Sequence, residues 1–424
     1  MNAIGWKEKR LRYFIDRSLG DDRKKQIATA EEVSFLPMES IGDNGTLDLS
    51  IVKQIEEVED GYTLLFDGDV VVAKITPCFE NGKGALINGL INGAGYGTTE
   101  LHVLTPNKEI DSQFLYYVTA SNQFRRLGEA QMKGAAGQKR VPGDFILNYR
   151  VSYPPMSEQK TIATRLNEEM SKIDLLINAK RRLVQLLGEK RRALITQAVT
   201  KGLNPDAPMK ESGIEWLGKI PRHWKIMHLK FLSSEPLMYG ANEAGLEEDP
   251  NYPRFIRITD IDENGLLRKD TFKSLPIDKA APFLLKVGDV LLARSGATVG
   301  KAFLYKQEWG KACFAGYLIR FRCNTLLLNP DFLFTYSQSE PYWTQINMLL
   351  IQATIQNFSA EKYGNLIIPV PEVKEQNFII DHISNRLAYF DTLRDATLKT
   401  ISLLHERRNA LIEAAVTGNI TIKG

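Results

Sequence analysis

The sequence predicts an α+β protein in which two mixed α/β domains are separated by a long antiparallel two-helix coiled coil, with an internal pseudo-two-fold repeat. The first observation is that residues 158–200 recur as residues 375–417 at a constant offset (376 − 159 = 217). The closing segments 189–200 and 406–417 are identical at 8 of 12 positions. A repeat this long exceeds the roughly 20–50 residues of a solenoid unit, so it predicts two copies of a domain plus a helix.

The repeat extends into the segments before each predicted helix, where matching residues alternate with stretches that differ freely. The matching pairs are Trp6-Lys7 and Trp224-Lys225, Gly68-Asp69-Val70 and Gly288-Asp289-Val290, Gly82-Lys83 and Gly300-Lys301, and Phe114-Leu115 and Phe332-Leu333. Packing fixes scaffold positions, whereas surface loops carry what is specific to each copy. We interpret the chain as one scaffold with two different working surfaces; the alternative is a duplicated domain whose loops have merely drifted.

Short apolar runs bounded by Gly, Asn and Asp predict the strands of each domain, and short helical patterns follow them. The expected strands are 69–75, 85–91, 289–293 and 317–322, and the expected helices are 112–127 and 330–336. They place the first domain at residues 1–153 and the second at residues 215–370. Residues 201–214, which contain Gly, Pro and charged side chains, are interpreted as a linker.

Apolar residues at heptad spacing predict the two spacer helices, at residues 154–200 and 371–417, with a tail at 418–424. The residues expected to pack between the helices are Leu166, Ile173, Leu176, Leu183, Leu187, Leu194, Ile383, Phe390, Leu393, Leu404 and Leu411. About 44 residues at about 1.5 Å each give a rod of roughly 65 Å with one apolar stripe, which needs a partner rod. The other copy is that partner, and it must run antiparallel because the second domain follows the far end of the first helix.

The composition indicates a globular protein, with 424 residues of which 43% are hydrophobic and 25% charged. No apolar run approaches the roughly 20 residues of a bilayer span, and the N-terminus lacks a signal-peptide pattern, so we expect a cytoplasmic protein without membrane contact. Cys78, Cys313 and Cys323 lack metal-ligand spacing and are expected to be reduced thiols. The net charge of +3 neither demands nor excludes nucleic acid.

The predicted helices and the segment that enters the second domain resemble a known family. The helix motifs are PPMSEQ…EKRRALITQAVT (154–200) and PVPEVKEQ…ERRNALIEAAVT (369–417), and the entry segment is SGIEWLGKIPRHWK (212–225). With the glycine loops after GDV, they make essentially the whole chain similar to the specificity subunit of type I restriction-modification enzymes. The first domain departs from the pattern because it begins at IGWK (4–7) without a preceding WLGKIP.

The resemblance implies a noncatalytic subunit for host defence, whose two target recognition domains each read one half of a split double-stranded DNA sequence. It implies that the helices fix the spacing and bind modification (methyltransferase) subunits, which we expect to number two, and that restriction (translocase/nuclease) subunits join the complex. S-adenosylmethionine, ATP and Mg²⁺ are expected on these partners, and no cofactor on this chain. Independently, two heads on a rod of fixed length can touch one face of B-DNA only at a definite spacing, since one turn is about 34 Å. Because the two heads have different loops, the target should be asymmetric.

Basic and amide side chains near the glycine loops are the predicted DNA contacts, because Arg and Lys pair with guanine edges or phosphates and Gln with adenine. The predicted DNA-binding residues are Lys74, Lys83, Lys133, Gln138, Lys139, Arg140, Arg254, Arg257, Arg294, Lys301, Gln352 and Gln356. For each of them, the alternative is an exposed, solvated side chain.

A search for catalytic motifs leaves no catalytic residue and no metal site. The loop 296–301 has three residues between its glycines and Ala302 after its lysine, so it fails the P-loop template; we expect a tight turn that lets the backbone approach a partner surface. Glu372-Val373-Lys374 has a nuclease-like spacing but opens the second helix, and the five histidines lack ligand spacing. An enzyme that acts alone on DNA, and a coiled-coil scaffold for protein or RNA, remain the alternatives.

Overall fold

The computed structural model describes residues 5–16, 31–135, 137–243, 248–261, 267–268, 270–351 and 357–419. It divides into two compact units. Unit 1 comprises Met1–Arg181 and Leu398–Gly424, and unit 2 comprises Arg182–Thr397. Each unit therefore contains one mixed α/β domain and a half of each long helix, whereas the sequence placed the boundaries at the helix ends.

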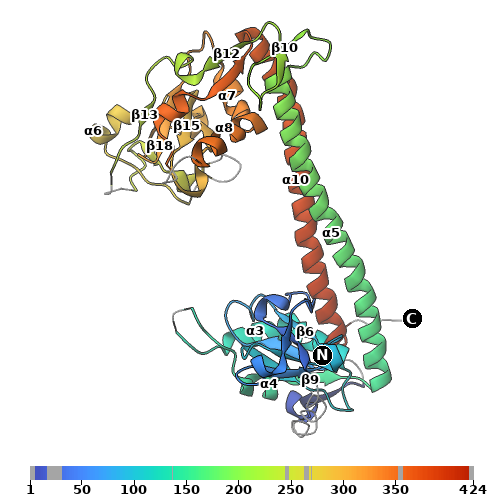
Figure 1. Cartoon of the computed structure of the whole chain (residues 1–424). Coiled ribbons are helices and arrows are strands. Elements are labelled where there is room, and N and C mark those ends of the chain that lie inside the picture. The colour runs from blue at the N-terminus through green and yellow to red at the C-terminus, as the bar shows by residue number, and fades with distance from the viewer. Residues whose placement is uncertain are drawn as a thin grey trace. The chain divides into compact units, whose positions relative to one another are not determined.

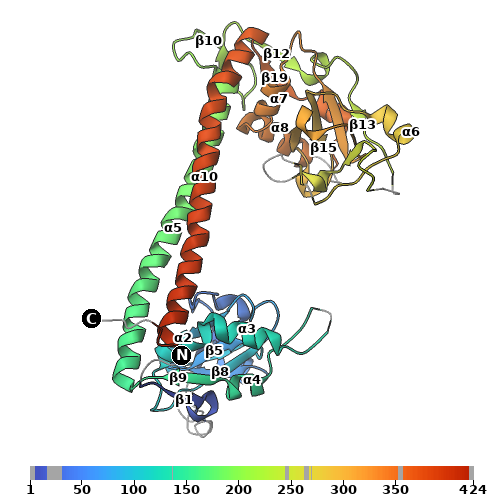
Figure 2. The ribbon, with the colours of Figure 1, turned by 180° about the vertical axis from the view of Figure 1, so that it is seen from behind.

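The described residues of unit 1 form three small sheets with the strand orders β1-β9, β3-β2-β7-β4 and β6-β5-β8. Figure 2 labels β1, β5, β8 and β9 of these strands. The strands are β1 Lys7–Arg10, β2 Glu32–Leu36, β3 Val52–Gln54, β4 Thr63–Phe66, β5 Val70–Ala73, β6 Gly84–Leu86, β7 Ala94–Gly97, β8 Leu101–Leu104 and β9 Arg150–Tyr153. The short helices are α2 Ser112–Ala120, α3 Asn122–Ala130 and α4 Gly143–Asn148. Every residue of β5 is buried, as expected for an apolar run between two neighbouring strands.

The segment predicted as one helix at residues 112–127 is two helices, because Ser121 interrupts it. Ser121 has extended backbone angles (φ −68°, ψ 149°), and its hydroxyl accepts a hydrogen bond from Phe124 N at 3.3 Å. Serine is a favoured N-cap residue because its side chain satisfies a free backbone N–H in the first turn. The chain therefore turns between α2 and α3, and both helices pack on the core of unit 1.

Unit 2 is also a mixed α/β unit (Figure 1), and its described strand orders are β10-β11, β12-β19, β13-β18-β15-β16 and β14-β17. The pair β12-β19 and the run β16-β15-β18 correspond to β1-β9 and β6-β5-β8 of unit 1. The strands are β10 Met209–Glu211, β11 Lys219–Pro221, β12 Lys225–His228, β13 Met238–Tyr239, β14 Arg254–Ile256, β15 Asp289–Ala293, β16 Ala302–Leu304, β17 Ala312–Phe314, β18 Leu318–Arg322 and β19 Ile367–Val370. The short helices are α6 Ile277–Ala280, α7 Pro330–Tyr336, α8 Glu340–Ile351 and α9 Ala360–Gly364.

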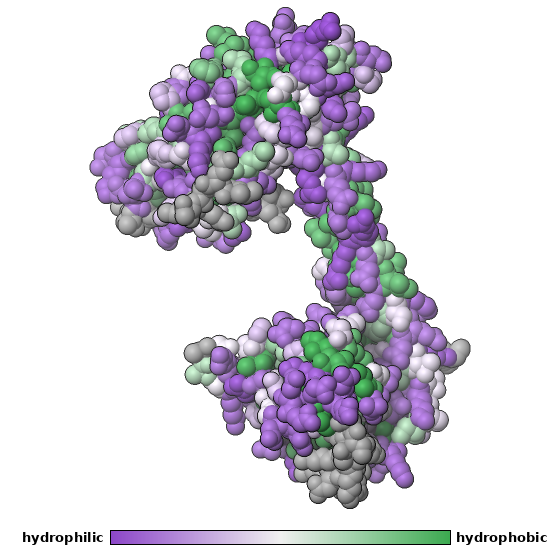
Figure 3. Space-filling model, viewed as in Figure 1, coloured by the Kyte–Doolittle hydropathy of each residue, from purple (hydrophilic) through white to green (hydrophobic). Residues whose placement is uncertain are grey.

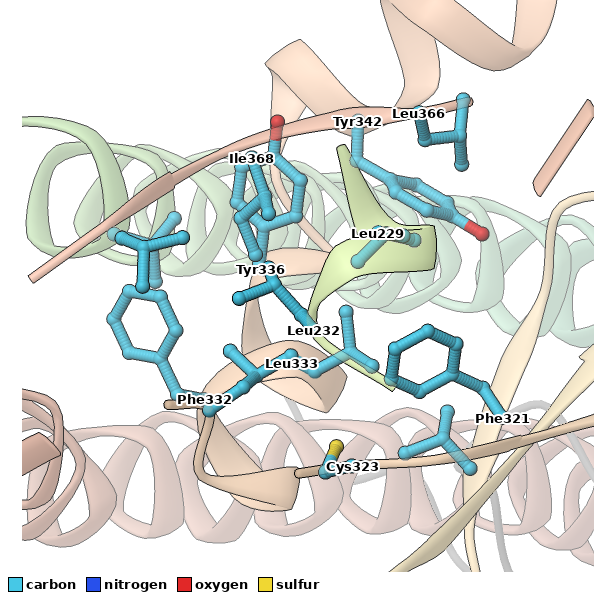
Figure 4. Close-up of a cluster of buried hydrophobic side chains, with 14 of the residues drawn as sticks. Leu229, Leu232, Phe321, Cys323, Phe332, Leu333, Tyr336, Tyr342, Leu366 and Ile368 are labelled. Atoms are coloured by element: carbon cyan, nitrogen blue, oxygen red, sulfur yellow. The ribbon is translucent and has the colours of Figure 1, made fainter. Parts of the chain in front are cut away.

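The core of unit 2 is built from aromatic and aliphatic side chains of α7, α8, β18 and the turn after β12 (Figure 4). Tyr336 is 1% exposed, and its hydroxyl donates to Ile367 O at 2.9 Å, so the ring is buried without an unpaired polar atom. Cys323 lies in the same core, and burial raises the pKa of its thiol to about 12. Cys78, Cys313 and Cys323 are all free thiols.

The segment predicted as a linker, residues 201–214, is ordered and belongs to unit 2. Met209–Glu211 pairs with Lys219–Pro221 as an antiparallel ribbon, and Arg222 N donates to Pro208 O at 2.7 Å. Leu203 packs against the core of unit 2. The apolar residues scattered among Gly, Pro and charged residues therefore anchor a segment whose composition resembles that of a linker.

The long helices are α5, Met156–Lys201, and α10, Val373–Val416. In unit 1, the first half of α5 packs with the last half of α10, and Leu166 and Ile173 share a core with Ile412. In unit 2, the last half of α5 packs with the first half of α10, and Ile195 shares a core with Ile383. No helix in the described ranges has an apolar stretch that would let it cross a membrane.

The predicted contact positions of the long helices differ from the structure at Leu176, which is 51% exposed, whereas its neighbour Ile177 is 3% exposed. The buried residues Met170, Ile173 and Ile177 follow one another in steps of three and four, so the apolar face of α5 includes Ile177 and not Leu176. The other predicted positions are buried (Leu166, Ile173, Leu187, Ile383) or half-buried (Leu183, Leu194, Phe390, Leu393, Leu404, Leu411).

Each unit contains the same ion pair between its two half-helices. In unit 1, Arg408 Nη1 lies 3.0 Å from Asp174 Oδ1. In unit 2, Arg191 Nε lies 3.3 Å from Asp391 Oδ1. The partners are equivalent in the repeat (174 + 217 = 391 and 191 + 217 = 408), so each pair joins one residue of each copy.

A buried glutamine ties the start of each long helix to its domain. Gln159 is 1% exposed; its Oε1 accepts from Asp111 N at 2.9 Å, and its Nε2 donates to Glu109 O at 3.1 Å and Pro154 O at 3.0 Å. Gln376 is 0% exposed and makes the equivalent bonds with Asn329 N, Leu327 O and Pro371 O. These matched bonds show that the repeat extends to the hydrogen bonding of the scaffold.

Candidate nucleic-acid interface

A projecting loop of unit 1, described at residues 133–135 and 137–140, carries most of the DNA contacts predicted for this unit; we call it the finger (Figure 1). The finger closes on itself, because Lys133 N donates to Arg140 O at 3.0 Å and Arg140 N donates to Lys133 O at 2.8 Å. Gly134 has φ +137°, and a Cβ there would lie 2.5 Å from Gln138 O, so glycine is required at this turn. The side chains of Lys133, Gln138 and Lys139 are exposed.

Arg140 is predicted as a DNA contact and pairs with a carboxylate at the base of the finger. Its Nε and Nη2 lie 2.9 and 2.7 Å from the two carboxylate oxygens of Glu100. The hydrogen bond from Arg140 lowers the pKa of Glu100, so the carboxylate stays charged at neutral pH. The pair holds the finger against the strand end that carries Glu100, while the side chain of Arg140 stays 48% exposed.

Two other predicted lysines of unit 1 donate to backbone carbonyls. Lys74 Nζ donates to Thr99 O at 2.7 Å, and burial lowers the pKa of Lys74. Lys83 Nζ donates to Met38 O at 2.8 Å. An ammonium group has three N–H donors, so each lysine has donors left after these bonds.

Arg294 of unit 2 is held from three sides at the end of β15. Its guanidinium carbon lies 4.6 Å from the centre of the Tyr239 ring, within the range of a cation–π contact. Its Nε donates to Asn357 Oδ1 at 3.2 Å, and its Nη1 contacts Gly316 O at 3.4 Å. A guanidinium carries five N–H donors, so three are left after these two bonds within the part of the chain that the structure describes.

The other two predicted arginines of unit 2 bind to residues of their own domain. Arg257 donates to both carboxylate oxygens of Asp260, whose side chain is 0% exposed, and this bond raises the pKa of Arg257. Arg254 packs over the Phe272 ring at 5.7 Å and donates to Arg268 O. Burial lowers the pKa of Arg254. Both side chains therefore stabilise the fold around β14, and a DNA role for them stays a prediction.

The glycine loop 296–300 of unit 2 turns tightly over the domain's own aromatic residues. Gly300 has φ +87°, and a Cβ there would lie 2.8 Å from the Trp343 ring. Gly300 O accepts from the Tyr342 hydroxyl at 2.8 Å, and Gly300 N donates to the Tyr363 hydroxyl at 3.1 Å. Gly300 thus allows close internal packing, whereas a Cβ at Gly296 would meet no atom of the described residues within 4 Å. An approach of the loop to a partner surface stays a prediction.

The remaining predicted residues divide into two groups. Lys301 follows this loop and is half-buried. Gln352 and Gln356 lie outside the described residues.

Tyr239 and Asn357, which hold Arg294, were not predicted, because no local motif marks a side chain that supports another from a distant part of the chain. In the described ranges, no group of three or more His, Cys, Asp or Glu side chains could hold a metal ion.

The chain matches a described family over most of its length. Residues 4–184 and 241–402, which exceed half of the chain, match the type I restriction modification DNA specificity domain. The match includes β5, the finger and most of α5 in the first segment, and β14 to β19 and most of α10 in the second. The finger, Arg294 and Asn357 therefore lie inside the matched regions, and Tyr239 lies just before the second one.

Individual relatives agree with this family. The specificity subunit of the Escherichia coli type I restriction enzyme EcoAI is 45% identical over 149 residues, covering 34% of this chain and 25% of that protein. The EcoEI specificity subunit from Escherichia coli is 44% identical with the same coverage. The chain thus spans about a quarter of the length of these two relatives. The MjaVIII specificity subunit from Methanocaldococcus jannaschii is 25% identical over 378 residues, covering 88% of this chain and 81% of that protein.

Solved structures share the fold at low sequence identity. A chain from work on complex assembly and conformational transition of the type I R-M system is 17% identical, with a TM-score of 0.77 and coverage of 99% of this chain and 100% of the other. The HsdS subunit from Thermoanaerobacter tengcongensis is 16% identical, with a TM-score of 0.53 and coverage of 98% of each chain. With the family match, these findings lead to one conclusion. The chain belongs to the type I restriction-modification DNA specificity family, whose members are noncatalytic specificity subunits.

Proposed function

We propose that this chain reads a split, asymmetric double-stranded DNA target for a type I restriction-modification complex, with one half-site for each domain. The observation that carries the proposal is one scaffold present twice with different exposed side chains. The buried glutamines and the helix ion pairs are the same in both units. By contrast, the finger of unit 1 carries Lys133, Gln138 and Lys139, whereas the strand end of unit 2 carries an arginine held by Tyr239.

We further propose that α5 and α10 pair as an antiparallel coiled coil with a pseudo-two-fold axis, which sets the distance between the half-sites. The two matched ion pairs support this, because each joins an Asp of one copy to an Arg of the other. In a pair of antiparallel helices related by a two-fold axis, a contact between residue i of one helix and residue j of the other occurs twice, with the two helices interchanged. The spacer would then act as a ruler along the DNA.

The long helices also offer a surface for the modification subunits, which we propose to number two. Figure 3 shows apolar side chains on the outside of these helices. Leu175 is 71% exposed, Tyr389 65% and Phe378 64%. Exposed apolar groups on a helix favour association with another protein surface. Restriction subunits would join this assembly in the cytoplasm, and S-adenosylmethionine, ATP and Mg²⁺ would bind to the partners.

Selection of bound sites from a random duplex library tests the proposal, using the full-length chain with its modification subunit. We expect a motif of two unlike halves separated by a fixed gap. In a second chain, the first domain is replaced by another copy of the second domain. The expected motif for that chain is an inverted repeat of the second half-site, because both heads would then be alike. Failure of the original chain to enrich any sequence would contradict DNA reading; enrichment with an unchanged motif in the second chain would contradict one half-site per domain.

A further inference from the structure

Three positions of unit 1 are brought together by backbone hydrogen bonds at the end of β5. Lys74 N donates to Glu100 O at 2.8 Å, so the residue after β5 lies beside the residue before β8. Val141 N donates to Lys74 O at 2.9 Å, and Arg140 forms an antiparallel bridge with Ile75. Lys74, Glu100 and Arg140 therefore lie together, although 66 residues separate the first from the last in sequence (140 − 74 = 66).

The same bonds bring together three positions of unit 2. Arg294 N donates to Tyr317 O at 3.1 Å, again joining the residue after one strand, β15, to the residue before another, β18. Phe358 N donates to Arg294 O at 2.8 Å, and Asn357 forms an antiparallel bridge with Ser295. Each bond of unit 1 thus has its counterpart in unit 2.

The long basic side chain makes the same contact in both units. Lys74 Nζ donates to Thr99 O, and Arg294 Nη1 contacts Gly316 O; each carbonyl belongs to the residue just before Glu100 or Tyr317. The first position is basic in both units, but the other two differ in chemistry, because Glu100 corresponds to Tyr317 and Arg140 corresponds to Asn357. A backbone preserved in this detail, with different and accessible side chains, is expected where one scaffold serves two specificities.

We infer that these three scaffold positions determine which bases each half-site carries. They are occupied by Lys74, Glu100 and Arg140 in unit 1 and by Arg294, Tyr317 and Asn357 in unit 2. This inference rests on the proposed function and adds the residues that set its specificity. None of the six side chains is fully buried: Arg140, Tyr317 and Asn357 are exposed, and Lys74, Glu100 and Arg294 are half-buried.

The two sets present different hydrogen-bonding groups to a base edge. The set of unit 1 offers a carboxylate, fixed by its bonds from Arg140, which accepts from the amino group of cytosine, beside the spare donors of Lys74. The set of unit 2 offers Arg294, three of whose donors have no partner among the described residues and suit the two acceptors of guanine. Asn357 accepts from Arg294 through Oδ1, and its two amide N–H donors make no bond to the residues that the structure describes.

Exchange of one set for the other tests the inference. The variant Lys74→Arg, Glu100→Tyr, Arg140→Asn gives unit 1 the side chains of unit 2, and its motif is selected from a random duplex library with the full chain and its modification subunit. We expect the preferred base to change by about tenfold or more in relative enrichment at one or more positions of the first half-site. The second half-site should keep its preferences.

The matched control is Glu8→Tyr, Arg150→Asn, which makes the same change at another ion pair of unit 1, where Arg150 Nη1 lies 2.8 Å from Glu8 Oε1. It should leave both half-sites unchanged. A second variant, Asn357→Asp in unit 2, should change the base preferences of the second half-site alone. This variant keeps the test valid if the triple variant does not fold. The inference is overturned if the folded triple variant or Asn357→Asp keeps the original base preferences, with or without weaker binding. Lack of any enriched motif for the unmodified chain would instead refute the proposed function.

Discussion

At the scale of single residues, the buried glutamines Gln159 and Gln376 control how each domain is attached to its long helix. Each amide uses its oxygen and its nitrogen to satisfy one N–H and two carbonyl groups of the backbone. A buried backbone group that loses its partner costs about 1–3 kcal/mol. Side chains of this kind therefore fix the geometry of a junction as well as its stability.

Gln159→Ala should lower the free energy of unfolding of unit 1 by about 2–4 kcal/mol, because three backbone groups lose their partner. The measurement is urea denaturation of the full chain, followed by far-UV circular dichroism. Gln185→Ala is the control, since Gln185 is exposed on the same helix and its replacement should change stability by less than about 0.5 kcal/mol. Equal effects of the two variants would show that the hydrogen bonds of Gln159 contribute nothing measurable.

His102 should make unit 1 less stable in mild acid. Burial lowers the pKa of His102 below its ordinary value of 6.5, although its Nε2 contact with Val141 O opposes the shift. The unfolded chain therefore binds a proton more readily than the folded chain, so the contribution of His102 is fully present above about pH 6.5 and is lost as pH falls below it.

Thermal unfolding at about pH 7.5 and about pH 5.5 measures this effect. The midpoint for unit 1 should fall at the lower pH, and His102→Gln should reduce that fall. His382→Gln, at an exposed position of α10, should leave it unchanged. If the midpoint of His102→Gln falls as much at the lower pH as that of the unmodified chain, groups other than His102 cause the pH dependence.

At the scale of elements, the face of α5 that packs in unit 1 is decided by a one-residue difference between Leu176 and Ile177. Ile177→Ala should lower the free energy of unfolding by about 2–4 kcal/mol, because it removes a buried side chain and leaves a cavity. Leu176→Ala should change it by less than about 0.5 kcal/mol, because the leucine is 51% exposed. Chemical denaturation of both variants shows which of the two residues faces the core. A larger loss of stability for Leu176→Ala than for Ile177→Ala would support the contact position predicted from the heptad pattern.

The elements also show where sequence patterns suffice. The runs DVVVA and DVLLA predict buried strands because their apolar residues are consecutive, and β5 and β15 lie there. The break between α2 and α3 was missed because Ser121 is compatible with a helix interior and acts as a cap only through its bond to Phe124 N. Residues 201–214 looked like a linker because composition does not reveal that Leu203 finds a core to pack against.

At the scale of the whole molecule, the proposed spacer makes a quantitative prediction. Three heptads inserted into each long helix, after Arg181 and after Thr400, add about 32 Å, close to one turn of B-DNA at about 34 Å. The selected motif should then keep both half-sites and gain about nine or ten base pairs between them. A single heptad adds about 10 Å, or about three base pairs, which turns the second half-site by about 100° around the DNA, so binding should weaken.

Site selection and fluorescence anisotropy with a labelled duplex measure both outcomes. Since insertions of seven residues keep the apolar stripe in phase to within about 20° per heptad, the helices should still pair. An unchanged gap after insertion of three heptads would mean that the helices do not set the spacing.

The sequence by itself determined the duplication, the mixed α/β class of both domains, and the position and period of the long helices. These features depend on patterns read along one chain segment, or on comparison of two segments, so no contact had to be known. Tertiary structure alone decided which basic side chains bind to other residues of the chain itself. Arg140 meets Glu100, and Arg294 meets Tyr239 and Asn357, across separations of 40, 55 and 63 residues. Hydrogen bonds and ring contacts between such distant residues exist only after the chain has folded, because the fold, and no local pattern, brings their atoms within reach.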